Sequence, residues 1–174
     1  MLARALSLDL VSSPEIDCSE NLNYCILKQN LNFKMSSNKV FVAGKFADAN
    51  RVAIIAETLE TVFGYSVTSK WFEKALLLPD LEDLSACSNE YLSDRAEENL
   101  QGVFDADLLV VLMDDPHYAY QGTWAEIGAA LQLRTPVLVI IPDNHGATRN
   151  SIFLHHAKVR CFEGEEALMA FLRV

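Results

Sequence analysis

Hydrophobic residues along the chain gather in short unbroken runs that are separated by amphipathic or polar stretches. Two of these runs, residues 108–113 and 137–141, consist almost entirely of Val, Leu and Ile. Such runs are typical of strands that are covered on both faces in a parallel sheet. Between them lie a polar loop, residues 114–122, and a helical pattern that begins near Thr123. This stretch therefore predicts a strand–helix–strand unit at the centre of the fold.

The chain before this unit shows a second strand–helix–strand pattern. Residues 39–43 form an apolar run, and Asp48 offers an N-cap for a helix that ends at Gly64. The apolar positions of this helix share one face: Val52, Ile55, Ala56, Leu59, Val62 and Phe63. Residues 65–70 alternate between polar and apolar side chains, which predicts a short strand with Trp71 at its carboxyl end.

The remaining pattern completes an α/β fold. An acidic segment, about residues 80–104, predicts the helix that leads into the central unit. After Pro142 and a polar loop, we expect a helical turn over 151–157, a fifth strand over 158–162 and a closing helix over 165–172. Strands that alternate with helices predict a flavodoxin-like, doubly wound, five-stranded parallel sheet. Because crossovers are right-handed, the simplest strand order is 2-1-3-4-5.

The first part of the chain does not share this pattern. Residues 1–37 mix Ser, Asn and isolated apolar residues without a sustained period. We therefore predict a loosely structured N-terminal extension over 1–37 and a single α/β domain over 38–174. A chain of 174 residues suits one domain with a full core.

The charge and hydrophobicity of the chain limit the kinds of molecule that it can bind. The formal charge of −10 and the pI near 4.8 give a surface that repels phosphate backbones and anionic membranes. No apolar run approaches the roughly 20 residues that span a bilayer. We therefore expect neither nucleic acid nor a membrane as partner. A small nucleotide stays compatible with this charge, because a helix N-terminus can hold one phosphate.

Metal ligands and disulfides are not indicated by the spacing of cysteine and histidine. The four cysteines form no CxxC pair and no zinc-like spacing with histidine: Cys18, Cys25, Cys87 and Cys161. His155 and His156 are adjacent, so on a helix they would diverge and could not bind one metal. We therefore expect reduced thiols in a cytoplasmic protein, and no metal or other cofactor.

The natural place for chemistry is the loop after the third strand. In open parallel sheets ligands bind at the carboxyl ends of the strands, so residues 114–122 and the helix start behind them are candidates. Glu126 lies at that helix start. It has a structural alternative, because Thr123 and Glu126 also match a capping box. Asp114 and Asp115 follow the strand directly, although Asp-Asp-Pro is also ordinary turn sequence.

Three segments carry a resemblance to a known family. KVFVAGKF at 39–46, AEENLQGVFDADLLVVL at 96–112 and GTWAEIGAALQLRTPVLVI at 122–140 resemble the nucleoside 2-deoxyribosyltransferase family. This family includes the deoxynucleoside 5'-monophosphate N-glycosidases. The order and spacing match over about residues 39–173. The resemblance implies cleavage of the N-glycosidic bond of a nucleoside or nucleotide, with Glu126 as the nucleophile that forms a glycosyl ester.

The resemblance also implies a set of substrate contacts. The loop after the first strand would line the sugar or phosphate side, and Asn150 or Ser151 would reach the site of a neighbouring subunit. The active unit would then be a homodimer or a higher homo-oligomer. The candidate substrate-binding residues are Gly44, Lys45, Phe46, Trp71, Asn99, Asp114, Tyr120, Gly122, Asn150 and Ser151.

Two positions depart from the family pattern. Asn99 stands where many members carry an acid that helps protonate the leaving base, and asparagine cannot supply a proton. Tyr120 stands where the transferases have a second carboxylate, for which Asp114 or Asp115 could substitute. These departures favour a hydrolase, or a protein that has kept the pocket and changed the reaction, over the classical transferase.

Other interpretations of the same residues stay open. Aromatic residues near the site, including Trp71 and Trp124, could stack on a base or belong to the core. His117 is a candidate for proton transfer. A second hypothesis is a nucleotide-binding or sensing module without catalysis. A third, by analogy of fold alone, is cleavage of the nicotinamide glycosidic bond of NAD.

Overall fold

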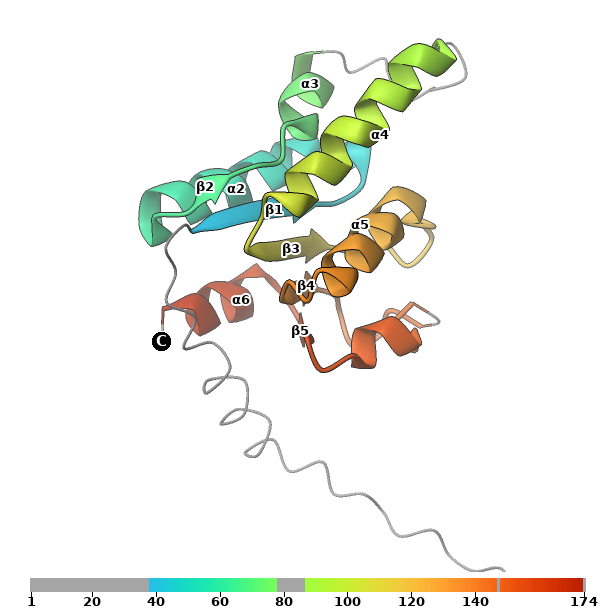
Figure 1. Cartoon of the computed structure of the whole chain (residues 1–174). Coiled ribbons are helices and arrows are strands. Elements are labelled where there is room, and N and C mark those ends of the chain that lie inside the picture. Colours follow the sequence, from blue (N-terminus) through green and yellow to red (C-terminus); the bar gives the residue numbers. More distant parts are fainter. Residues whose placement is uncertain (1–37, 78–86, 147, 174) are drawn as a thin grey trace, which may run out of the picture. The chain divides into compact units, whose positions relative to one another are not determined.

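The computed structural model describes residues 38–77, 87–146 and 148–173. Its centre is a five-stranded, all-parallel sheet with strand order β2-β1-β3-β4-β5 (Figure 1). The strands are β1 (Lys39–Ala43), β2 (Ser66–Val67), β3 (Leu108–Leu112), β4 (Val137–Ile140) and β5 (Val159–Phe162). The flavodoxin-like fold and the strand order predicted from the sequence are confirmed. The predicted extension, residues 1–37, lies outside the described residues.

Helices cover both faces of the sheet. They are α2 (Ala49–Phe63), α3 (Trp71–Leu77), α4 (Asn89–Phe104), α5 (Gln121–Gln132) and α6 (Glu165–Leu172), with 3-10 turns η1 (Phe46–Asp48) and η4 (Ile152–His155). On one face Val40 and Val42 of β1 pack with residues of α2, α3 and α6. On the other face Phe41 and Ala43 pack with α4, α5 and η4. This division follows from the strand period of two, because alternate side chains point to opposite faces.

The register brings the loops of interest to one edge. β3 is buried along its whole length and lies between β1 and β4, with Val110 opposite Val42 and Leu138. The carboxyl ends of these three parallel strands therefore meet at the same edge of the sheet. The segments that leave this edge are residues 44–48, 113–120 and 141–151.

The start of α5 differs from the capping-box prediction, which is wrong. α5 begins at Gln121, and its N-cap position is Tyr120 in the left-handed conformation, with φ of 50°. The backbone N–H of Trp124 already donates to the carbonyl oxygen of Tyr120 at 2.8 Å. Thr123 is therefore the third residue of the helix and not its N-cap, so Thr123 and Glu126 cannot form a capping box.

The second strand is shorter than the predicted 65–70, and Trp71 begins a helix that the pattern did not predict. The reason is that a backbone N–H of β1 bonds to a side chain instead of to the backbone of β2. The N–H of Val42 is bonded to the hydroxyl oxygen of Ser69 at 3.1 Å, so a side chain replaces the next backbone pair of the ladder. Because the chain leaves the sheet there, α3 can start at Trp71.

Helix boundaries elsewhere follow the prediction with local differences. Gly64 ends α2 in the left-handed conformation, as expected. Asp48 occupies the N-cap position of α2, but its side chain forms no cap hydrogen bond. Val62, predicted on the buried face, is 60% exposed. α4 begins only at Asn89, and residues 78–86 of the predicted helix lie outside the described part. No helix of that part is long and apolar enough to cross a bilayer.

Candidate functional site

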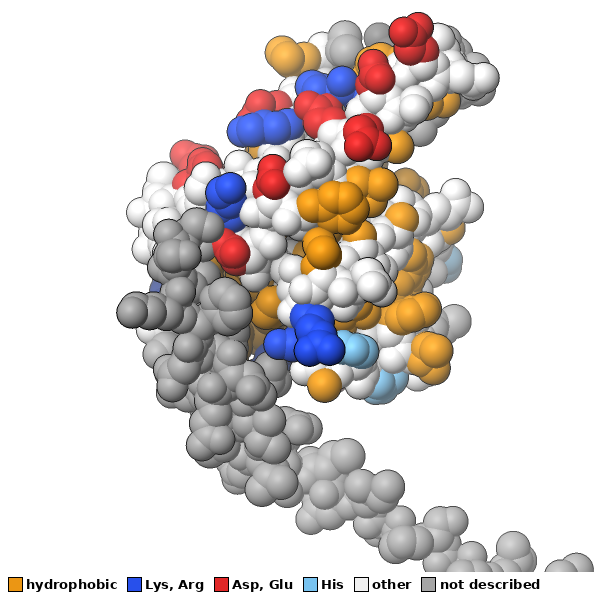
Figure 2. Space-filling view, viewed as in Figure 1, with side chains coloured by type: hydrophobic (Ala, Val, Ile, Leu, Met, Phe, Trp, Pro, Cys, Tyr) orange, Lys and Arg blue, Asp and Glu red, His pale blue; other side chains and the backbone are white. Residues whose placement is uncertain are grey.

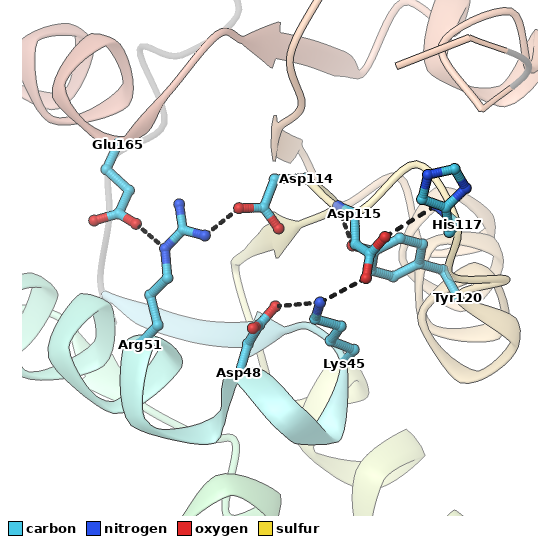
Figure 3. A network of polar contacts seen from close by, with 8 residues as sticks. All are labelled: Lys45, Asp48, Arg51, Asp114, Asp115, His117, Tyr120 and Glu165. Atoms are coloured by element: carbon cyan, nitrogen blue, oxygen red, sulfur yellow. Dashed lines mark hydrogen bonds and ion pairs between the residues drawn. The ribbon is translucent and has the colours of Figure 1, made fainter.

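A network of charged side chains lies at the carboxyl edge of the sheet (Figure 3). Lys45 follows β1, and its Nζ lies 2.8 Å from Oδ2 of Asp115 and 3.7 Å from Oδ2 of Asp48. Asp115 follows β3, so this contact joins the loops of two neighbouring strands. The hydrogen bond between Lys45 and Asp115 stabilises the charged form of both side chains. It raises the pKa of the lysine and lowers the pKa of the aspartate.

A second group in the same network centres on Arg51. Its guanidinium binds Asp114 through one terminal nitrogen, and its Nε lies 2.5 Å from Oε1 of Glu165. Arg51 comes from the first turn of α2, Asp114 from the loop that follows β3, and Glu165 from the first turn of α6. The arginine therefore links three elements that are far apart in the sequence.

The network carries more negative than positive charge. Two cations, Lys45 and Arg51, meet four carboxylates: Asp48, Asp114, Asp115 and Glu165. Burial raises the pKa of Asp48, and the nearby aspartates add to this rise. Each cation is therefore already paired with carboxylates, which offset its attraction for a phosphate. Within the described residues, no group of three or more His, Cys, Asp or Glu side chains is arranged to hold a metal ion.

The β3–α5 loop is held together by its own side chains. The hydroxyl of Tyr120 accepts the backbone N–H of Asp115 at 2.9 Å, and Oδ1 of Asp115 accepts the N–H of His117 at 2.9 Å. Tyr120 is 1% exposed, and the ring of Tyr118 packs against it edge to face at 4.9 Å. Tyr120 thus supports the loop from inside, and its hydroxyl is already engaged.

Glu126 lies on the buried face of α5, outside this network. Its side chain is 8% exposed, beside Thr123 and Ile127 on the same buried face of the helix. Burial raises the pKa of Glu126 to about 8, from an ordinary value of 4.5. The carboxyl group is therefore mostly neutral at pH 7. A desolvated acid whose pKa is shifted this far is a candidate functional group on physical grounds.

Two hollows of the described surface lie away from Glu126. One, of about 450 Å³, lies between α2 and α6 and includes Ile54, Glu165 and Met169 in its lining. The other, of about 210 Å³, lies between α2 and the segment from Val67 to Glu73. Glu126 lines neither. Because the Glu126 side chain is only 8% exposed, a pentose can reach it only if groups packed around it move apart.

Several predicted contacts have structural roles in this chain. A Cβ at Gly44 would lie 3.1 Å from Cγ2 of Val52, so close packing of β1 against α2 accounts for the glycine. The indole N–H of Trp71 donates to the carbonyl oxygen of Val42 at 2.9 Å. Phe46 packs against the core on the α2 side of the sheet. The structure brings Lys45 and Asp114 into the network described above.

The other predicted contacts are not part of that network. Asn99 is half-buried on α4. Gly122 lies exposed in the first turn of α5 and has open space around the Cβ position. Asn150 is exposed, whereas Ser151 is half-buried and its N–H donates to the carbonyl oxygen of Thr148.

Sequence reasoning missed Arg51, Glu165 and His145. Arg51 could have been found, because a cation in the first turns of the helix after the first strand lies at the carboxyl edge. His145 carries no such signal. It is 2% exposed in the loop after β4, and both ring nitrogens are buried without a hydrogen-bond partner. Its ring centroid lies 6.4 Å from that of Tyr120. A buried polar ring without partners carries a desolvation cost.

Comparison with known protein-family models and with curated proteins found no match to this chain.

Proposed function

We propose that this protein cleaves the N-glycosidic bond of a nucleoside or nucleotide, with Glu126 acting at the anomeric carbon. The observation that supports this proposal is a buried carboxyl group, with a pKa of about 8, at the start of the helix that follows the central strand. Burying a carboxyl group is costly unless it is neutralised or paired. Such costly groups gather at functional sites, because catalysis needs a shifted pKa.

The reaction uses the ionised form of Glu126. One carboxylate oxygen forms a bond to C1' of the sugar, the C1'–N bond breaks, and its electron pair leaves with the base. The base takes a proton from solvent. Water then attacks the glycosyl ester, which releases the sugar and restores the carboxylate, or a second base takes the place of water. Asn99 cannot protonate the base, so we favour bases that leave readily.

The raised pKa gives this mechanism a distinct pH dependence. If Glu126 is the nucleophile, kcat/KM rises as the pH approaches about 8, because the carboxylate fraction increases. If the protonated acid instead donates a proton to the leaving base, the rate falls above the same pH. A pH–rate profile therefore separates the two roles.

The direct test measures free base by chromatography. The purified protein is incubated with nucleosides, deoxynucleosides, their monophosphates and NAD. We expect base release from at least one of them, and a loss on the order of 10³-fold or more in Glu126→Gln. Glu57→Gln, at an exposed position of α2, is the matched control. Release that is unchanged in Glu126→Gln contradicts the proposed nucleophile. Addition of a second free base distinguishes transfer from hydrolysis.

A second candidate function is nucleotide binding without catalysis. Two observations favour it: the hydroxyl of Tyr120 is engaged by Asp115, and Glu126 lines neither of the two hollows. This function predicts saturable calorimetric binding of a nucleotide with no base release at high protein concentration. We place either activity in the cytoplasm, on the cysteine spacing described above.

A further inference from the structure

The side chain of His145 is buried without a hydrogen-bond partner. It is 2% exposed, and neither ring nitrogen has a partner among the described residues. Five polar or charged side chains of that part of the chain are buried: Ser69, Thr123, Glu126, Thr135 and His145. Of these five, only His145 has fully buried polar atoms that lack a partner. Buried polar groups are normally paired, so this exception needs an explanation.

The loop that carries His145 is held by its own hydrogen bonds. Nη1 of Arg149 donates to the carbonyl oxygen of Ile141 at 2.9 Å, and Nη2 lies 2.5 Å from Oδ1 of Asp143. The backbone N–H of His145 donates to the carbonyl oxygen of Pro142 at 3.1 Å. None of these bonds uses the imidazole. A phenylalanine ring would fill similar space without the desolvation cost, so packing alone does not account for the histidine.

His145 lies at the same edge of the sheet as the candidate site. Its loop leaves the carboxyl end of β4, and β4 pairs with β3, from which the β3–α5 loop leaves. The ring centroid of His145 lies 6.4 Å from that of Tyr120. Tyr120 is the N-cap residue of α5, the helix that carries Glu126. His145 therefore lies beside the residue from which this helix starts.

A ligand can reach His145 only if the β3–α5 loop moves, because the imidazole is 2% exposed and the Tyr120 ring packs beside it. Residues 116–119 of this loop are exposed (Figure 3). Tyr120 has a φ of 50°, a conformation that residues with a side chain rarely adopt. Release of this strain offsets part of the cost of moving the loop.

We propose that His145 binds the nucleobase of the ligand, donating a hydrogen bond from the imidazole to an acceptor atom of the base. This inference rests on the proposed function as far as the ligand is a nucleoside or nucleotide, which both candidate functions share. An imidazole ring offers an N–H donor, and every nucleobase carries nitrogen or carbonyl oxygen acceptors. Such a bond gives His145 the partner that the described chain does not provide.

The surrounding charge favours an uncharged ring over a phosphate as this partner. The network at the carboxyl edge holds four carboxylates and two cations, so its potential disfavours an anion. Figure 2 shows hydrophobic and uncharged surface over α5 and η4, whereas acidic and basic side chains gather over the outer part of α4. A nucleobase also has an aromatic face that can pack against the ring of Tyr120.

In the cleavage reaction this hydrogen bond becomes stronger in the transition state. The electron pair of the C1'–N bond moves onto the base, so the acceptor atoms of the base become more negative. A donor that is already in place stabilises this charge. The base still takes its proton from solvent, so the proton balance of the reaction does not change.

Histidine ring signals in NMR spectra measure the contact without requiring cleavage. Isotope-labelled protein is titrated with adenosine, guanosine, cytidine, uridine and their 2'-deoxy forms, and the His145 signal is assigned by its absence in His145→Phe and His145→Gln. We expect at least one nucleoside to shift this signal in a saturable manner. Ribose and inorganic phosphate should not shift it, and the signal of His155, exposed on η4, should not respond. A His145 signal that responds to none of these nucleosides, or equally to phosphate, overturns the proposal.

His145→Phe separates a ligand contact from a structural role. It removes both nitrogens and keeps an aromatic ring, so its Tm without ligand should equal or exceed that of the wild type. The nucleoside that shifts the His145 signal should bind the variant about tenfold more weakly and raise its Tm less. His155→Phe is the matched control and should bind as the wild type does. Lower stability of His145→Phe, or binding equal to that of the wild type, contradicts the proposed contact.

Base release is measured separately from binding. Base release without a response of the His145 signal rejects the contact and leaves the proposed cleavage standing. A saturable response without base release rejects cleavage and leaves the contact standing.

Discussion

Replacement of Glu126 by glutamine should make the protein more stable at neutral pH. Burial raises the pKa of Glu126 to about 8, so the folded state prefers the protonated acid, whereas the unfolded chain ionises near 4.5. Between these two values the unfolded state binds fewer protons than the folded state. The free energy of unfolding therefore falls as the pH rises through this window. Glutamine keeps the shape of the neutral acid and cannot ionise.

The size of the effect follows from the two pKa values. The gap between 4.5 and about 8 corresponds to roughly 4–5 kcal/mol at about 1.4 kcal/mol per pH unit. At pH 7 most of this loss has occurred, so Glu126→Gln should be more stable than the wild type by about 3 kcal/mol. Below pH 4.5 the two proteins should have nearly equal stability. Above pH 8 the difference should level off.

Urea unfolding monitored by tryptophan fluorescence, at a series of pH values and fixed protein concentration, measures this difference. Glu57→Gln, at an exposed position, should show a small difference from the wild type at every pH. A stability difference between Glu126→Gln and the wild type that does not change with pH would refute the reasoning. It would mean that the carboxyl group is solvated or paired in the folded protein. If Glu126→Gln both loses base release and gains stability, the Glu126 carboxyl group lowers the stability of the fold and is needed for activity.

Two further substitutions test the structure around the site. Gly102→Ala should destabilise the fold by up to about 2 kcal/mol, because overpacking against Phe41 costs about 1–3 kcal/mol and better helix propensity returns about 1 kcal/mol. Adding Phe41→Leu should recover part of this loss in thermal unfolding, and no recovery would argue against the contact. Tyr120→Phe should lower stability by about 1–2 kcal/mol in urea, because the N–H of Asp115 loses its acceptor. If Tyr120→Phe keeps its stability but changes the KM for the substrate, the hydroxyl instead contacts the ligand.

The sequence by itself determined the architecture. Unbroken apolar runs at 108–113 and 137–141 indicate strands that are buried on both faces. The helical spacing of apolar residues before Gly64 indicates a helix with one buried face. These are local patterns, so they can be recognised without knowing what packs against each element. Right-handed crossovers then leave few strand orders for five such strands, and the observed order is the predicted one. This strand order also brings the polar loops together at the carboxyl edge of the sheet.

The tertiary structure alone decided which side chains meet there. Arg51 and Glu165 are 114 positions apart, and no period in the sequence relates them. Tyr120 and Trp71 were candidates for a ligand, but their polar groups are engaged by Asp115 and Val42. The burial that shifts the pKa of Glu126 likewise depends on how α5 packs. Spacing shows which helix face is apolar, whereas the solvation and partner of one carboxyl group depend on every element around it.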